Sequence, residues 1–182
     1  MKLRQIVLTA ALTALTALAG MLSHGVFQAL VPFSLLPIMV YLSGIILGGA
    51  YGALAMLTYI LLGLFGLPVF ASAPFAGFGY IFKPTFGYLL GYIGAAFVVG
   101  KLYRPGSLIR AALGVLAGMV VLYFFGLSYL YAIFRWVLHR QLDVKQVMEM
   151  GFLPFILGDL VKGGIAVWVG NQVVLRRKER HT

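Results

Sequence analysis

Long apolar segments separated by short polar or glycine-rich connections dominate the chain. They predict six helices, over residues 6–22, 35–47, 53–67, 85–100, 111–131 and 152–174. A membrane crossing needs about 20 residues, so the second and third helices are short, and we expect them to tilt or to extend into their flanks. The glycines within residues 48–52 divide an apolar run that is too long for one crossing, because glycine supplies turn geometry.

The first apolar segment, residues 6–22, follows a short basic start and allows two interpretations. Residues 17–19 resemble a signal-peptidase site behind a short apolar core. The segment stays apolar past that site, which favours a retained first helix. Ala10 and Ala14 lie four residues apart on one face, where small side chains let another helix approach closely. This strip suits either packing within this protein or docking of a partner helix.

The connection over residues 66–84 is rich in glycine, proline and aromatic side chains. So many turn-forming residues favour a structured cap over a flexible linker, and a water-exposed linker would carry fewer aromatic residues. Two interpretations follow: a lid over a ligand pocket, or a belt of aromatic side chains at the membrane interface. The side chains concerned are Phe70, Phe75, Phe78 and Tyr80.

The composition sets the class of protein. Of 182 residues, 62% are apolar and 10% are charged, and the mean hydropathy is +1.02. A soluble domain carries about a quarter charged residues, so this chain has too little polar surface to cover a water-facing globule. We expect one integral membrane domain over residues 1–182, in the cell membrane. The absence of cysteine excludes disulfides and thiolate metal ligands.

The net charge of +10 comes from basic residues at the ends of the predicted helices. The two tails and the connection over residues 101–110 hold nine lysines and arginines, whereas the connections on the opposite side hold four. By the positive-inside rule, both termini are predicted to be cytoplasmic. Basic residues in this pattern orient a membrane chain, which argues against nucleic-acid binding.

An acidic and a basic residue, Asp159 and Lys162, lie well inside the last apolar segment. Three residues apart on a helix, they share a face and can touch. Charges at this depth are costly unless they pair or line a polar cavity, which makes them candidates for function. The pair either holds helices together or anchors a polar ligand. At about 1.5 Å per residue, Asp159 is predicted about 10 Å below the external end, beneath residues 66–84.

Several kinds of chemistry have no counterpart in the sequence. It contains no Walker A motif and no acidic set of Mg²⁺ ligands, so we do not expect this chain to hydrolyse ATP by itself. His24, His139 and His181 are scattered without an HExxH motif, which argues against a metal site. A carboxylate beside an ammonium stays ionised, which favours holding a ligand over general-base catalysis. We therefore predict neither an enzyme nor a cofactor.

Several motifs resemble those of one membrane protein family. The most specific are Gly-Leu-Pro-Val-Phe at residues 66–70 and Gly-Asp-Leu-Val-Lys at residues 158–162, and Lys-Pro-Thr-Phe-Gly at residues 83–87 is similar too. The family is BioY, the biotin-specific S components of energy-coupling factor (ECF) vitamin importers. The likeness covers about residues 30–101 and 152–165, while the first and fifth helices match only in character.

The resemblance implies a bundle of six transmembrane helices that binds biotin near the outer face. It also implies partners, namely a membrane coupling protein that docks on Ala10 and Ala14, and two cytoplasmic ATPases. Biotin offers ureido N–H groups that Asp159 would accept, while Lys162 would neutralise Asp159 and face a ligand oxygen. The implied substrate site comprises Phe70, Phe75, Tyr80, Lys83, Tyr88, Asp159 and Lys162.

Two other functions stay open at this point. One is an S component for a different vitamin, such as a flavin or thiamine. The other is a membrane enzyme or a packing protein in which Asp159 and Lys162 are purely structural.

Overall fold

The computed structural model describes residues 3–23 and 34–179, without the side chains of residues 177 and 178. The described chain is mainly helical and contains no strand. Its long helices are α1 (Leu3–Leu22), α3 (Leu36–Leu47), α4 (Gly49–Leu64), α5 (Phe86–Leu102), α6 (Leu108–Ala132) and α8 (Leu153–Glu179). The shorter ones are the 3₁₀-helix η1 (Phe78–Phe82), the π-helix η2 (Ile133–Val137) and the α-helix α7 (Val144–Gly151). The predicted all-helical class is confirmed.

Each predicted helix has a counterpart, and the main differences lie at the helix ends. The break predicted across residues 48–52 is confined to Gly48, where φ is 80°, and α4 begins at the next residue. Glycine adopts such a positive φ readily, whereas a Cβ makes it unfavourable. The connection between the predicted helices over residues 111–131 and 152–174 contains α7, which Asp143 and Gln146 cap reciprocally at its N-terminus.

Three segments of the described chain are long and apolar enough to cross a membrane: Leu3–Leu22, Leu108–Val137 and Leu153–Arg176. The helices α3, α4 and α5 are apolar but shorter. Large apolar side chains are exposed on the outside of the bundle, for example Leu18 and Trp168. A surface of this kind suits contact with lipid better than contact with water.

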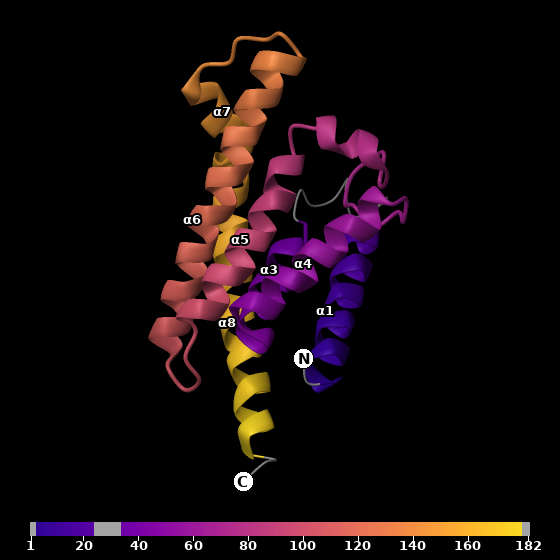
Figure 1. Ribbon diagram of the computed structural model, residues 1–182. Helices are drawn as coiled ribbons and strands as arrows, with labels where there is room; N and C mark the ends of the chain where they lie inside the picture. Colours follow the sequence, from indigo (N-terminus) through magenta and orange to yellow (C-terminus); the bar gives the residue numbers. More distant parts are fainter. Residues whose placement is uncertain (1–2, 24–33, 180–182) are drawn as a thin grey trace.

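Figure 1 shows α6 and α8 running side by side, with α1 on the opposite side of the bundle. The central helix is α3, which contacts α1, α4, α5 and α8, while α5 packs most extensively against α6. The start of α1 and the end of α8 lie at the same end of the bundle (Figure 1). We call this the terminal end. The opposite end, which carries residues 65–85 and α7, is the loop end.

Glycines bring helices into close contact, as two crossings illustrate. A Cβ on Gly91 of α5 would lie 2.8 Å from the carbonyl oxygen of Leu122 in α6. Near the terminal end, a Cβ on Gly100 would lie 2.3 Å from backbone atoms of both Gly48 and Gly49. Between helices in lipid, van der Waals packing of this kind replaces the hydrophobic driving force.

The connection over residues 65–85 is folded onto the bundle, which agrees with the predicted structured cap. Phe70 is fully buried, with its ring centroid 6.0 Å from that of Tyr59 and 4.3 Å from that of Tyr80. The Tyr59 hydroxyl donates to the Val69 carbonyl at 3.0 Å and so fixes the connection to α4. Other aromatic side chains of this region face outward, namely Phe65, Phe78 and Phe82.

Candidate ligand-binding site

A cavity of about 630 Å³ is lined by residues at the loop end of the bundle. Ligand pockets typically measure about 300–1,000 Å³. Its wall combines the end of α1, the start of α3, part of the 65–85 connection, the first half of α5, one residue of α6 and the first turns of α8. The lining residues are Leu22, Ser23, Ser34, Leu35, Leu36, Pro37, Ala71, Ser72, Tyr80, Thr85, Tyr88, Leu89, Tyr92, Tyr123, Phe155, Asp159 and Lys162.

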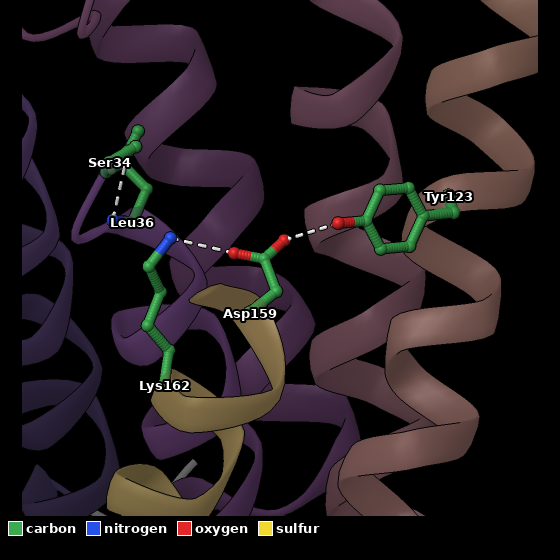
Figure 2. Close-up of polar contacts among 5 residues, drawn as sticks. All are labelled: Ser34, Leu36, Tyr123, Asp159 and Lys162. Carbon is green, nitrogen blue, oxygen red and sulfur yellow. Dashed lines mark hydrogen bonds and ion pairs between the residues drawn. The ribbon is translucent and has the colours of Figure 1, made fainter. Parts of the chain in front are cut away.

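The ion pair between Asp159 and Lys162 lies on this wall. The Lys162 Nζ donates to Asp159 Oδ1 at 2.7 Å, and the two residues are only 7% and 5% exposed. The contact follows from the sequence because residues three apart share one face of α8. Figure 2 shows Lys162 extending between Asp159 and the start of α3, where Ser34 Oγ accepts the Leu36 N–H at 3.2 Å. Within a buried ion pair, each charge compensates the other. Because this pair borders a cavity, both charged groups can still form hydrogen bonds with a bound ligand.

A second donor, which the sequence did not reveal, reaches the same carboxylate. The Tyr123 hydroxyl donates to Asp159 Oδ2 at 2.7 Å from α6, on the side of Asp159 away from Lys162 (Figure 2). Tyr123 is one of ten tyrosines in the chain, and no local pattern sets it apart. Its role depends on how α6 packs beside α8.

Two of the aromatic residues predicted for the site, Tyr80 and Tyr88, line the cavity. The Tyr80 hydroxyl forms a 2.9 Å hydrogen bond with Ser72 Oγ, and the Tyr88 hydroxyl donates to the Gly151 carbonyl at 2.7 Å. Their hydroxyls thus have protein partners while the rings contribute to the wall. Tyr92, one helical turn after Tyr88, also lines the cavity, although it was not in the predicted set.

Three other predicted site residues, Phe70, Phe75 and Lys83, are not among the lining residues of the cavity. Phe70 packs against Tyr80, and the half-buried Phe75 accepts a backbone hydrogen bond from Phe70 at 2.9 Å. The Lys83 Nζ donates to the lining residue Ser72 at 3.0 Å and to the Ala73 carbonyl.

The Lys83 ammonium also lies 5.2 Å from the centroid of the Tyr80 ring. Burial lowers its pKa below the usual lysine value. Lys83 is thus linked to the cavity through its hydrogen bond with the lining residue Ser72.

The predicted docking residues Ala10 and Ala14 are exposed on α1. The face of α1 that packs within this chain carries threonines instead, and Thr13 donates across to the Ala55 carbonyl of α4 at 3.2 Å. The alternative in which the alanine strip packs inside this protein therefore does not hold.

The polar groups of the cavity wall are hydroxyls and one ion pair. Within the described ranges, no three His, Cys, Asp or Glu side chains gather in a way that could hold a metal ion. Most of the wall is apolar, so the cavity suits a small molecule with an apolar body. The hydroxyls and the ion pair can form hydrogen bonds with polar groups of that molecule.

The sequence model of the BioY family matches residues 1–179. The chain belongs to the BioY family. It is 35% identical to the biotin transporter BioY of Thermotoga maritima over 98% of this chain and 100% of that protein. It is also 35% identical to the probable biotin transporter BioY of Lysinibacillus sphaericus, over 85% of this chain and 78% of that protein.

The fold of this BioY family member is shared with a solved structure. The crystal structure of the S-component for biotin from an ECF-type ABC transporter aligns with a TM-score of 0.73, over 95% of this chain and 94% of that one, at 22% identity. Family membership and the membrane-capable helices together make the chain a multi-pass protein of the cell membrane. BioY is a family of transporters, not of enzymes.

Proposed function

We propose that this chain captures biotin from outside the cell as the membrane-embedded S component of an ECF-type importer. The observation that carries the proposal is the buried Asp159–Lys162 pair on the wall of a cavity of about 630 Å³, in a chain of the BioY family. Charges are seldom buried at membrane depth without a functional reason. The relatives named biotin transporters supply the identity of the guest.

The proposed topology is one transmembrane domain over residues 1–182 with six crossings and both termini in the cytoplasm. Two observations support it. The start of α1 and the end of α8 share one end of the bundle (Figure 1). That end is also where the basic residues concentrate, as the positive-inside rule requires of a cytoplasmic face. The cavity then opens to the outside, at the loop end.

Biotin suits the chemistry of this wall. Its bicyclic head offers two ureido N–H donors and one carbonyl acceptor, and its apolar tail ends in a carboxylate. Asp159 would accept hydrogen bonds from the two ureido N–H groups. Lys162 would balance the charge of Asp159 and donate a hydrogen bond to the ureido carbonyl oxygen. The rings of Tyr80 and Tyr88 would contact the apolar parts, and the ring of Phe70 packs against that of Tyr80.

The tail carboxylate would lie toward the part of the wall formed by Ser72. Lys83 donates to Ser72 at 3.0 Å and therefore places a cation one hydrogen bond behind that point. This arrangement favours an anionic group of the ligand near Ser72 and N–H donors near Asp159.

A ligand panel tests the proposal. The full chain, purified in detergent from biotin-depleted cells, is heated in the presence of biotin, riboflavin or thiamine. A ligand that binds only the folded state stabilises it by about 2.7 kcal/mol when the ligand concentration is 100 times the Kd. We therefore expect the unfolding midpoint to rise with the logarithm of the biotin concentration. Stabilisation by another vitamin, or by none, would overturn the assignment and favour one of the alternative functions.

We further propose that Ala10 and Ala14 form the docking strip for a membrane coupling protein that carries two cytoplasmic ATPases. Both alanines are exposed on α1, which leaves the strip accessible to another helix. Replacing both with leucine keeps biotin binding intact. It weakens association by about tenfold or more, because overpacking a close contact costs about 1–3 kcal/mol per site.

Copurification of the coupling protein and the ATPases with the tagged chain measures this effect. The control is Ala112→Leu, at an exposed alanine on α6 that lies outside the strip. Equal recovery of partners with the Ala10→Leu/Ala14→Leu chain and the unmodified chain would remove the strip from the proposal.

A further inference from the structure

We propose that Tyr123 is a positioning residue of the biotin site, which holds the Asp159 carboxylate so that its remaining acceptor positions face the cavity. This inference rests on the proposed function. It concerns a residue of α6 that lies outside the motifs by which the sequence resembles the family.

Among the residues that the structure describes, one donor engages each of the two oxygens of Asp159. Lys162 Nζ lies 2.7 Å from Oδ1, and the Tyr123 hydroxyl lies 2.7 Å from Oδ2. The donors come from α8 and α6 and approach the carboxylate from opposite sides (Figure 2). A carboxylate held at both oxygens cannot rotate freely, and about half of its four lone-pair positions stay available. Those positions suit two N–H donors of a guest.

The direction of the Tyr123 hydrogen bond follows from charge. An ionised carboxylate only accepts hydrogen bonds, so the Tyr123 hydroxyl must donate its one proton to Asp159. The hydroxyl oxygen then has only lone pairs to offer, and Tyr123 lines the cavity. The wall at this point presents acceptors from both Asp159 and Tyr123, which favours guests rich in N–H groups.

The Tyr123 ring is itself held in place by its neighbours. Its centroid lies 4.9 Å from that of Phe152 and 6.2 Å from that of Tyr88, both with the rings nearly perpendicular. Tyr88 in turn fits against two glycines: a Cβ on Gly126 would lie 2.4 Å from its ring, and one on Gly151 would lie 2.6 Å from its hydroxyl. The chain of contacts therefore fixes the direction of the Tyr123 hydroxyl.

The partner of Tyr123 sets it apart from tyrosines that serve packing. The hydroxyls of Tyr59 and Tyr129 donate to backbone carbonyls, at 3.0 Å to Val69 and at 2.6 Å to Ile81. Tyr123 donates instead to an ionised side chain on the wall of the cavity. Loss of its hydroxyl therefore changes the site and not merely the packing of α6.

Tyr123→Phe removes the hydroxyl and keeps the ring. We expect its biotin affinity to fall about 10- to 100-fold, because the lost hydrogen bond is made to a charged group. In an Asp159→Asn background the same change should cost less than about threefold, because residues that act through one another are not additive. The control Tyr129→Phe loses a hydroxyl of the same helix that bonds to backbone, and its affinity should match that of the unmodified chain.

A spectroscopic measurement without biotin gives a second, independent readout. The chain contains two aspartates, Asp143 and Asp159, so labelling the side-chain carboxyl of aspartate with carbon-13 gives two infrared carboxylate bands. Asp143→Asn assigns the remaining band to Asp159. Tyr123→Phe should shift that band, whereas Tyr129→Phe should leave it in place.

The outcomes separate this inference from the proposed function. If the unmodified chain fails to bind biotin, the function is wrong, and the Asp159 band still decides whether Tyr123 orients the carboxylate. If the unmodified chain binds biotin and Tyr123→Phe binds it equally well, or the band does not move, the positioning role is refuted while the function stands.

Discussion

Asp159→Asn reduces biotin affinity by about 100- to 1,000-fold. Two charge-assisted hydrogen bonds to the ureido group weaken, each worth about 1.5–3 kcal/mol, and one factor of ten in affinity corresponds to about 1.4 kcal/mol. The change also leaves the Lys162 ammonium buried without the carboxylate that it contacts at 2.7 Å. Breaking a buried ion pair costs about 3–5 kcal/mol of stability. Titration calorimetry and thermal unfolding in detergent measure the two effects on the same samples.

The double variant Asp159→Asn/Lys162→Met separates binding from stability. Removing the second charge abolishes the cost of burying an ammonium beside an uncharged amide side chain, so the unfolding midpoint recovers most of what Asp159→Asn lost. Biotin affinity stays low because the anionic acceptor is gone. Recovery of biotin binding together with stability would contradict the role assigned to Asp159.

Gly100→Ala is expected to destabilise the fold by about 3 kcal/mol or more, or to prevent its accumulation in the membrane. The added Cβ would lie 2.3 Å from backbone atoms at the junction of α3 and α4, and 2.7 Å from the Gly44 carbonyl oxygen. Backbone atoms cannot swing aside as a flexible side chain can, so the helices must separate. The unfolding midpoint and the yield of monodisperse protein are the measurements.

Gly164→Ala is the matched control for this change. Gly164 lies on α8, and a Cβ there would meet no atom within 4 Å. Alanine is more favourable than glycine in a helix by about 1 kcal/mol. The Gly164→Ala variant should therefore be as stable as the unmodified chain or more stable. Similar losses for both variants would show that helical glycines matter here for a reason other than the close crossing at Gly100.

The helices could be predicted from the sequence because each consists of a long apolar run, and lipid-facing helices need little else. Their ends were harder to place. The start of α7 had a readable signal, the capping pair Asp143 and Gln146, but the surrounding charges favoured a plain connection. The break between α3 and α4 was assigned to several glycines although a single positive φ at Gly48 suffices.

In the site, contacts between residues close in the sequence could be predicted, whereas contacts between distant residues could not. The contact of Asp159 with Lys162 was predictable because it depends only on spacing along one helix. The contact with Tyr123 joins residues of two helices, so it depends on the rotation of α6, which hydropathy does not encode. Phe70 and Lys83 were included in the site because of the family resemblance, and a resemblance in sequence cannot tell a lining side chain from one that contacts a lining residue.

The depth of Asp159 in the membrane bears on how a bound molecule would reach the cytoplasm. From Asp159, α8 continues without a break to Glu179, about 30 Å at about 1.5 Å per residue. Below the cavity the helices close on one another through contacts such as that of Gly100 with Gly48. A molecule bound at Asp159 would therefore still have about two thirds of the roughly 30 Å hydrocarbon layer to cross, and the packed helices close its way. Under the proposed function, the coupling protein and its two ATPases would supply the energy that opens a route to the cytosol.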